Sequence, residues 1–433
     1  MNICFFNRSY WPDQAATGQL LTELAEDLVN RHGCAVTVVA GRPLHGSGRS
    51  RPMLWPVTRE MRRGVTILRS NGTRFGPDRF SGRVANYLSY FASATLASFG
   101  VGRPDIVISL TDPPIIGLAA RWTARRTGAR FVFLCEDIFP EVASLIESFQ
   151  HQTVDRALDR VNRYLLREAD GVVALGERMC RRLVEEKGAD PSRVHVIHNW
   201  ADCDAIVPGE KANGFSREHS LDDRFVVMHS GNVGLSQNLD VAIDAAARLQ
   251  SRERLLLVIV GNGARREALE REVGRRGLSN VRFLPYVPKE QLHESFAAAD
   301  VFLVSLKPGL EGYIVPSKLY GILAAGRPYV AAVDPSCEAA TIAVEHGCGV
   351  VADPGSADDL ARKLAALYDD PATVRSMGNN ARSIAWRFDR RVAVQAYYDL
   401  LLRVAGVARA GAPAARASAN ARVRASGGGV PAS

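Results

Sequence analysis

The first half of the chain alternates short apolar runs with stretches in which apolar residues recur at helical spacing. Continuous runs rich in Val, Ile, Leu and Phe are typical of strands buried on both faces of a parallel sheet. Such runs lie at Ile3–Phe6, Ala35–Ala40, Val65–Arg69, Asp105–Leu110, Arg130–Leu134, Gly171–Leu175 and Val194–Ile197. Helical patterns lie at Gln19–Asn30, Ile115–Thr127 and Glu177–Lys187. This order predicts βαβ units, and the polar segment Arg42–Arg63 is predicted to be a surface loop.

A second series of the same kind begins after a polar stretch, Asp202–Ser220, which contains Pro208 and Gly209. Its predicted strands are Phe225–His229, Leu255–Val260, Val281–Leu284, Val301–Val304, Tyr329–Val333 and Gly349–Val351. The repeat predicts an α/β fold of two doubly wound domains that face each other across a cleft. The predicted parts are a first domain at 1–205, a linker at 206–221, a second domain at 222–388, a helix at 389–403 that could cross back, and a disordered Ala/Arg/Gly tail at 404–433.

Charge and cysteine content narrow the class of protein. The formal net charge is +8, but five arginines after Leu402 have no acid beside them. Without those five the charge is +3, and no nucleic-acid motif is present, so nucleic acid is not an expected partner. The seven cysteines form no CxxC pair, which argues against a zinc site or a disulfide framework and predicts a reducing cytoplasm. The first residues have no basic segment before the apolar run, so a signal peptide is not expected there.

The segment between Arg83 and Arg103 contains no charged residue and has the composition of a helix. Asn86 and several serines make it too polar for a transmembrane span. Two interpretations stay open: a helix packed in the domain core, or a helix that also touches a membrane surface.

The segment Gly309–Pro328 reads as a loop followed by a helix that begins near Ser317. The start of a helix offers unpaired N–H groups and a positive dipole end, which suit a phosphate. A hydroxyl (Ser317), a cation (Lys318) and an acid (Glu311) surround this start. A phosphate joined to a hydroxyl-rich group would fit this chemistry. An ordinary strand–loop–helix unit with surface charges fits the pattern equally well.

With these parts placed, the chain resembles the two-Rossmann-domain (GT-B) glycosyltransferases, and among them the retaining family 4. Six ordered segments carry the resemblance: the Gly18 loop before LLTELAEDLV, RVHVIHNWAD, HSGNVG, VIVGNGARREALE, FLPYVPKEQLHESFAAADVFLVSL and EGYIVPSKLYGILAAGRP. Within the family it is similar to the branch that builds bacterial capsule, exopolysaccharide or O-antigen units. The resemblance implies retaining transfer of a hexosyl or N-acetylhexosaminyl group from a nucleoside diphosphate sugar to a hydroxyl, without a metal or other cofactor.

The resemblance also implies a donor site in the second domain. The base would lie near Val287, and the diphosphate would meet the amides of Ser317, Lys318 and Leu319. Glu311 matches the first glutamate of the family's paired-glutamate motif, which contacts the donor sugar. Gly18 would let backbone approach the phosphate or the acceptor. The first glycine of the second domain and its neighbour, Gly231 and Asn232, complete the expected donor-binding set.

Three positions depart from the family pattern. The second glutamate falls on Gly321, the usual arginine on Asn232, and the usual lysine on Gln237. The two missing cations would neutralise the leaving diphosphate. Their loss is expected to move that role to Lys318 and the helix start, with help from Arg265 or Arg266.

On the acceptor side, Glu136 and Asp137 follow the strand Arg130–Leu134 and are placed to orient or deprotonate the acceptor hydroxyl. The alternative is that one of them caps the next helix. The family suggests a polyprenyl-linked glycan acceptor, and so a cytoplasmic protein that is peripheral at the inner face of the plasma membrane. A sugar-nucleotide epimerase or hydrolase, and a non-catalytic sugar-nucleotide-binding partner, remain open as functions.

Overall fold

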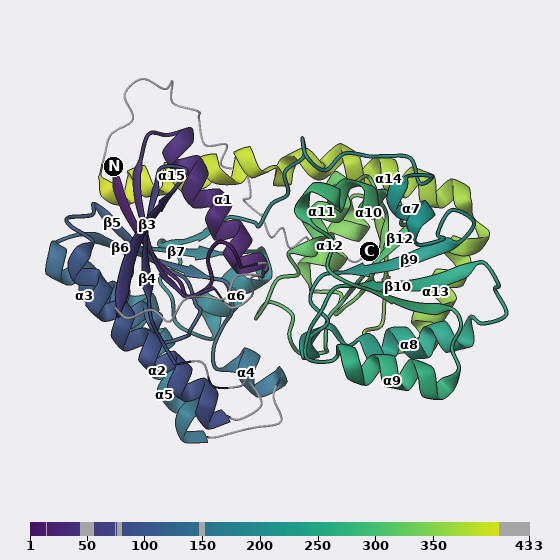
Figure 1. Ribbon diagram of the computed structural model, residues 1–433, viewed down its shortest axis with the longest axis horizontal. Helices are drawn as coiled ribbons and strands as arrows, with labels where there is room; N and C mark the ends of the chain where they lie inside the picture. The colour runs from purple at the N-terminus through teal and green to yellow at the C-terminus, as the bar shows by residue number, and fades with distance from the viewer. Residues whose placement is uncertain (14, 44–55, 74, 76–79, 147–151, 407–433) are drawn as a thin grey trace, which may run out of the picture.

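The computed structural model describes residues 1–433 except 14, 44–55, 74, 76–79, 147–151 and 407–433. Two α/β domains lie side by side, each built on its own twisted sheet with helices around it (Figure 1). The predicted fold of two doubly wound domains is confirmed.

The sheet of the first domain has eight strands in the order β3-β4-β2-β1-β5-β6-β7-β8, and every pairing is parallel except that of β3 with β4. The strands are β1 (Asn2–Phe6), β2 (Ala35–Gly41), β3 (Val57–Arg62), β4 (Val65–Ser70), β5 (Ile106–Ser109), β6 (Arg130–Cys135), β7 (Gly171–Ala174) and β8 (Val194–Val196). β3 lies inside the segment predicted to be a surface loop, and that prediction is wrong there. Arg63 and Gly64 both have positive φ, as the two-residue turn of a tight hairpin requires.

The described part of residues 1–205 adds six α-helices to this sheet: α1 (Ala16–Asn30), α2 (Phe80–Ala97), α3 (Ile116–Thr127), α4 (Glu141–Ile146), α5 (Gln152–Glu168) and α6 (Glu177–Glu185). The helical expectation for the uncharged segment is met by α2. Tyr90 and Ala94 of this helix are buried, whereas Leu88 and Leu96 are 54% and 50% exposed. Within the described residues, no helix combines the length and the apolar character needed to cross a bilayer.

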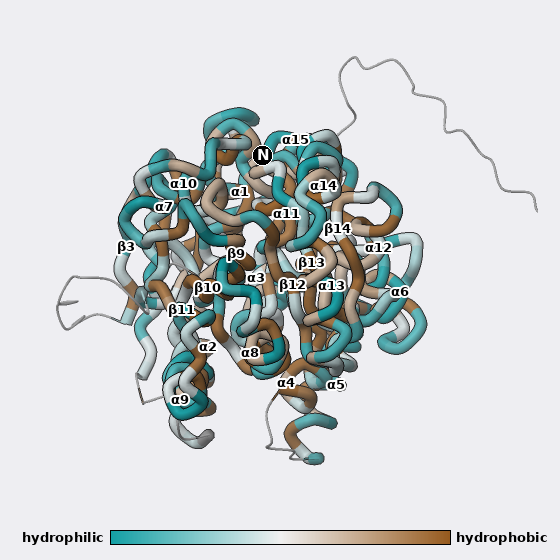
Figure 2. The backbone as a smooth tube through the Cα atoms, turned by 90° about the vertical axis from the view of Figure 1, so that its right-hand side faces the viewer, coloured by the Kyte–Doolittle hydropathy of each residue, from teal (hydrophilic) through white to brown (hydrophobic). Residues whose placement is uncertain are grey.

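The sheet of the second domain has six parallel strands in the order β11-β10-β9-β12-β13-β14. They are β9 (Phe225–Ser230), β10 (Leu255–Val260), β11 (Val281–Leu284), β12 (Val301–Ser305), β13 (Tyr329–Ala332) and β14 (Gly349–Ala352). The helices are α7 (Gly214–Glu218), α8 (Leu239–Arg248), α9 (Arg266–Arg276), α10 (Leu292–Ala297), α11 (Lys318–Ala324), α12 (Glu338–Glu345), α13 (Ala357–Asp369) and α14 (Pro371–Ala385). Figure 2 shows the hydrophobic strands inside, with more hydrophilic helices and loops around them. Two apolar cores, one on each face, hold this sheet.

The chain passes between the domains twice. The predicted linker 206–221 is not a free connection, because it contains α7 and places Phe215 and Leu221 in the core of the second domain. After α14, the chain returns to the first domain, and the helix α15 (Arg390–Ala405) lies along that domain (Figure 1). Its residues Val394, Tyr397 and Leu401 are buried in the core of the first domain. The rest of the predicted tail, 407–433, lies outside the described residues.

Candidate functional site

The carboxyl ends of strands from both sheets meet between the domains. The segment after β6 is joined to the loop after β12, because the Ile138 N–H donates to the carbonyl oxygen of Tyr313 at 2.9 Å. A cavity of about 180 Å³ opens nearby, lined by Ile146 from the first domain and by Arg265 and Lys307 from the second. Ligands of open parallel sheets bind at the carboxyl ends of the strands. This interdomain cleft is therefore the candidate site.

The turn after β9 packs backbone against backbone on the turn after β10. Gly231 has a φ of +128° and Gly261 a φ of +134°. A Cβ atom at Gly261 would lie 1.9 Å from the carbonyl oxygen of Gly231, so only glycine fits there. Asn232 follows with an exposed side chain. Both predicted donor-binding residues of this turn, Gly231 and Asn232, therefore lie at the carboxyl end of β9.

The ammonium of Lys318, the first residue of α11, lies beside the turn after β9. Its Nζ donates to Gln237 Oε1 at 2.9 Å and lies 3.1 and 3.3 Å from the two ring nitrogens of His229. A Cβ atom at Gly231 would lie 3.8 Å from the same nitrogen. The lysine thus stands beside Gln237, the position at which the family pattern has its own lysine.

Burial sets the charge state of this group. Burial lowers the pKa of Lys318 to about 7. Burial, and then the nearby Lys318 charge, lower the pKa of His229 well below its usual value, so the imidazole is neutral. The His229 ring is fully buried, and it contacts the ammonium. Neither the neutral His229 ring nor the Gln237 amide oxygen carries a negative charge that would neutralise the Lys318 ammonium. The ammonium can therefore bind an anion.

The start of α11 matches the sequence expectation in part. Ser317 is the N-cap residue, but its side chain makes no capping hydrogen bond. The Leu319 N–H donates to the carbonyl of Pro316 at 3.3 Å. Of the three amides expected to meet a diphosphate, that of Leu319 is therefore already paired within the chain.

Gly321 stands where the family pattern has its second glutamate, and its neighbours leave no room for a longer side chain. A Cβ atom there would lie 2.8 Å from the ring of Phe296 on α10. Phe296 packs on Phe302 of β12, with ring centroids 5.0 Å apart. An aromatic pair therefore occupies the space that a longer side chain at position 321 would need.

The predicted base-binding residue, Val287, follows β11 and is half-buried against the core of the second domain. Two residues later, Lys289 pairs with Glu23 of α1 in the first domain. The segment after β11 therefore reaches the other side of the cleft.

Asp137 and Glu136 lie directly after β6, on the first-domain side. The Asp137 N–H donates to Thr111 Oγ1 at 3.3 Å. Burial, reinforced by the nearby Asp112 carboxylate, raises the pKa of Asp137 to about 7. Burial raises the pKa of Glu136 to about 8, although a hydrogen bond with Thr17 opposes the rise. Both acids can exchange a proton near neutral pH, as an acceptor-side base requires.

Gly18 does not lie in a loop, which corrects the sequence prediction. Helix α1 begins at Ala16, and Gly18 lies in its first turn. A Cβ atom there would be 3.4 Å from the Asp13 side chain and 3.4 Å from the Tyr10 amide nitrogen. The small residue thus lets the helix pack closely on the preceding segment.

Glu311 is held from the other domain, which the sequence did not indicate. Arg182 on α6 donates from Nε to the Glu311 carbonyl at 2.7 Å and from Nη2 to its carboxylate at 3.2 Å. The two residues are 129 positions apart. The glutamate is thus placed at the cleft, but its side chain has a partner from the first domain.

The two arginines proposed as substitutes for the missing cations have other partners. Arg265 pairs with Asp240 at 2.5 Å. Arg266 donates to the carbonyl of Leu284 at 2.7 Å and pairs with Glu270 at 2.8 Å. Lys318 is therefore better placed than either to meet a phosphate. Among the described residues, no group of three or more His, Cys, Asp or Glu side chains could hold a metal ion.

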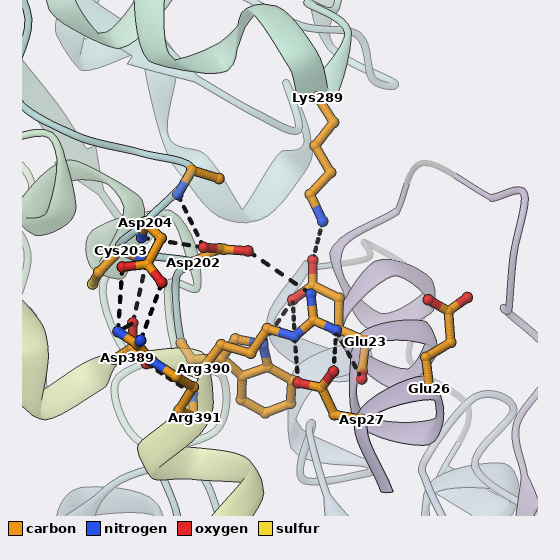
Figure 3. Close-up of polar contacts among 12 residues, drawn as sticks. Glu23, Glu26, Asp27, Asp202, Cys203, Asp204, Lys289, Asp389, Arg390 and Arg391 are labelled. Carbon is orange, nitrogen blue, oxygen red and sulfur yellow. Dashed lines mark hydrogen bonds and ion pairs between the residues drawn. The ribbon is translucent and has the colours of Figure 1, made fainter. Parts of the chain in front are cut away.

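Figure 3 shows the polar network where the chain crosses between the domains. Arg390, the first residue of α15, donates to both carboxylate oxygens of Asp27 at 2.8 Å. Trp200 donates to Glu23 at 2.8 Å, and Lys289 reaches the same carboxylate from the second domain (Figure 3). The segments that cross between the domains are thus held on α1 by the bidentate ion pair of Arg390 with Asp27 and by the contacts to Glu23.

Two family models match the chain. Residues 16–200 match a glycosyl transferase 4-like domain, and residues 212–384 match glycosyl transferases group 1. Among curated proteins, a probable glycosyltransferase WbjE of Pseudomonas aeruginosa is 27% identical over 65% of this chain and 70% of its own. A putative colanic acid biosynthesis glycosyl transferase WcaI of Escherichia coli K12 is also 27% identical, over 60% of this chain and 65% of its own.

Solved structures agree in fold. Anabaena HepE, solved in complex with UDP and glucose, superposes with a TM-score of 0.72 at 19% identity and covers 93% of this chain and 100% of its own. WaaG, a glycosyltransferase involved in lipopolysaccharide biosynthesis, superposes with a TM-score of 0.70 at 17% identity and covers 92% and 99%. Because the two family models together span most of both domains, the chain belongs to the family 4 type of GT-B glycosyltransferases.

Proposed function

We propose that the protein transfers a hexosyl or N-acetylhexosaminyl group from a nucleoside diphosphate sugar to a hydroxyl of a lipid-linked glycan, with retention of configuration, in the synthesis of a cell-surface polysaccharide. The observation that carries the donor part is the Lys318 ammonium beside Gly231 and Gln237, at the carboxyl end of β9. The colanic acid and lipopolysaccharide roles named for WcaI and WaaG, and the UDP bound to HepE, support the substrate classes.

In this proposal the leaving diphosphate meets the Lys318 ammonium and the amides of Ser317 and Lys318 at the start of α11. A cation and dipoles that are already in place stabilise the charge that develops as the glycosidic bond breaks. Glu311 orients the donor sugar through its hydroxyls. Asp137 accepts the proton of the attacking acceptor hydroxyl, because its raised pKa suits a base near neutral pH.

The direct test measures donor consumption with a panel of nucleoside diphosphate sugars, with and without a polyprenyl-linked glycan acceptor. We expect consumption that depends on the acceptor and is unchanged by excess EDTA, since the proposed charge stabilisation uses Lys318. Equal consumption without acceptor would indicate an epimerase or hydrolase. Donor binding without consumption would indicate a non-catalytic partner. Loss of activity in EDTA that Mg²⁺ restores would contradict the metal-independent reaction.

We also propose that the protein acts at the inner face of the plasma membrane. Leu96 of α2 and Phe99 are exposed, as is Trp122 of α3. Arg126 stacks over the Phe99 and Trp122 rings at 5.0 and 5.4 Å. Apolar side chains with adjacent arginines suit reversible binding to anionic lipid.

The membrane proposal predicts flotation with anionic liposomes at low salt and weaker flotation at high salt or with neutral liposomes. Each arginine close to the surface would contribute about 1 kcal/mol. Replacing both Leu96 and Phe99 by serine should reduce flotation. The control is Val344→Ser, which alters a 71% exposed apolar residue of the second domain. Equal absence of the wild-type protein from all liposome fractions would contradict the proposal.

A further inference from the structure

The loop that carries Glu311 belongs to the second domain but is docked on the first. Arg182 of α6 is buried, with its side chain 9% exposed, and it donates to both the backbone carbonyl and the carboxylate of Glu311. One guanidinium therefore fixes the path of the loop and the direction of its acid.

Two further contacts fix the guanidinium itself. Its Nη1 donates at 2.7 Å to Oε1 of Glu186, the residue that directly follows α6. The guanidinium carbon lies 3.8 Å from the centre of the Tyr313 ring, and the Tyr313 hydroxyl donates to Glu186 Oε2 at 2.8 Å. Arg182, Glu186 and Tyr313 thus close a ring of contacts across the two domains.

Gly312 shows how closely the loop approaches α6. Its φ is +76°, and a Cβ atom there would lie 2.6 Å from Arg178 Cγ and 3.0 Å from Arg182 Nε. Any side chain at this position would both strain the backbone and push the loop away from the helix. The sequence Glu311-Gly312-Tyr313 is therefore suited to docking on α6.

The same loop fixes the position of the acceptor-side acid. The carbonyl of Tyr313 accepts the N–H of Ile138 at 2.9 Å, and Ile138 directly follows Asp137. Glu311 and Asp137 come from different domains, yet each lies within two residues of this one hydrogen bond. Their separation thus depends on how the loop is docked.

We propose that Arg182 is a positioning residue that sets the donor-sugar acid Glu311 relative to the acceptor-side acid Asp137 when the domains are together. This inference rests on the proposed glycosyl transfer. In it, Arg182 touches neither substrate. It holds one oxygen of Glu311 and leaves the other, Oε2, for hydroxyls of the donor sugar.

The test compares Arg182→Ala with Arg181→Ala, a neighbouring exposed arginine on the same helix. For Arg182→Ala we expect kcat of transfer to fall by about 100-fold, the scale of a misplacement of roughly 1 Å, with the donor KM changed far less. We also expect a larger share of donor to be lost to water, since a misplaced acceptor hydroxyl competes less well. Arg181→Ala should match the wild type in both readouts.

A double-mutant cycle with Glu311→Gln separates positioning from general destabilisation. If Arg182 acts through Glu311, the loss in the double variant should be smaller than the product of the single losses. Independent losses, or an unchanged ratio of hydrolysis to transfer in Arg182→Ala, would overturn the proposal.

Amide exchange of 309–314 gives a readout that does not need activity. It should be faster in Arg182→Ala than in Arg181→Ala, because the docking contacts are lost. Equal exchange in the two variants would overturn the docking role. If the wild-type protein transfers no sugar, the proposed function fails, and amide exchange still decides whether Arg182 docks the loop.

Discussion

Replacing Lys318 by alanine is expected to lower kcat about 100- to 1000-fold, the scale for removing one preorganised electrostatic contact at a developing charge. The ammonium lies between Gln237 and His229. The family pattern has cations at positions 232 and 237, where this chain has Asn232 and Gln237. Thermal stability should change little, because removing a buried cation also removes its desolvation cost. The measurement is single-turnover transfer together with a melting curve.

The control is Lys363→Ala, which removes a lysine from α13, away from the cleft. It should keep wild-type turnover. Retention of more than half of wild-type turnover by Lys318→Ala would contradict the role of this lysine.

Donor binding by the wild type should also depend on pH. Because the pKa of Lys318 is lowered to about 7, the free protein loses this positive charge as the pH rises through that value. A bound diphosphate favours the protonated ammonium, so affinity for the nucleoside diphosphate should fall between about pH 6 and about pH 8. Lys318→Ala should remove this dependence, which calorimetry can measure.

Asp137→Asn carries the second large expected effect, a loss of about 100- to 10,000-fold in kcat, the range for removing a general base. The amide keeps the shape and the neutral charge of the protonated acid, so the fold should persist. The pKa of Asp137 is raised to about 7, so the carboxylate forms as pH rises and the wild-type rate should rise with it. Since Lys318 loses charge over the same interval, the rate should pass through a maximum near neutral pH.

Glu136→Gln is the comparison variant for that experiment. The pKa of Glu136 is about 8, so this acid is mostly protonated at neutral pH and its amide should resemble it. We expect a smaller loss than for Asp137→Asn. A larger loss would assign the base to Glu136, and no loss from either variant would contradict an acid of this segment as base.

The fold was predictable where one physical signal dominated. Strand β10 has six apolar residues in succession, all of them buried. Such a run is typical of a strand covered on both faces of a parallel sheet. The antiparallel β3 was missed because half of its residues are exposed, and two of these, Arg59 and Glu60, are charged. Helix α5 was not among the predicted elements, although Val154, Leu158, Val161 and Leu165 recur in it at helical spacing.

The site was predictable only as far as its local segments. The cluster of Glu311, Ser317 and Lys318 could be predicted from the sequence, because the three residues lie in one loop and the helix start that follows it. The contact between Arg182 and Glu311 could not be read from the sequence, because it joins different domains. The contact of Lys318 with His229 and Gln237 likewise depends on tertiary packing rather than on any local pattern.

The return of α15 to the first domain has a consequence for the order of folding. The core of that domain includes Val394, Tyr397, Leu400 and Leu401, which are synthesised after the whole second domain. Domains that are continuous in sequence can fold in turn as the ribosome makes them. Here the first domain is synthesised first but completed last. Its apolar face stays uncovered while about half of the chain is synthesised, until α15 emerges and packs on it.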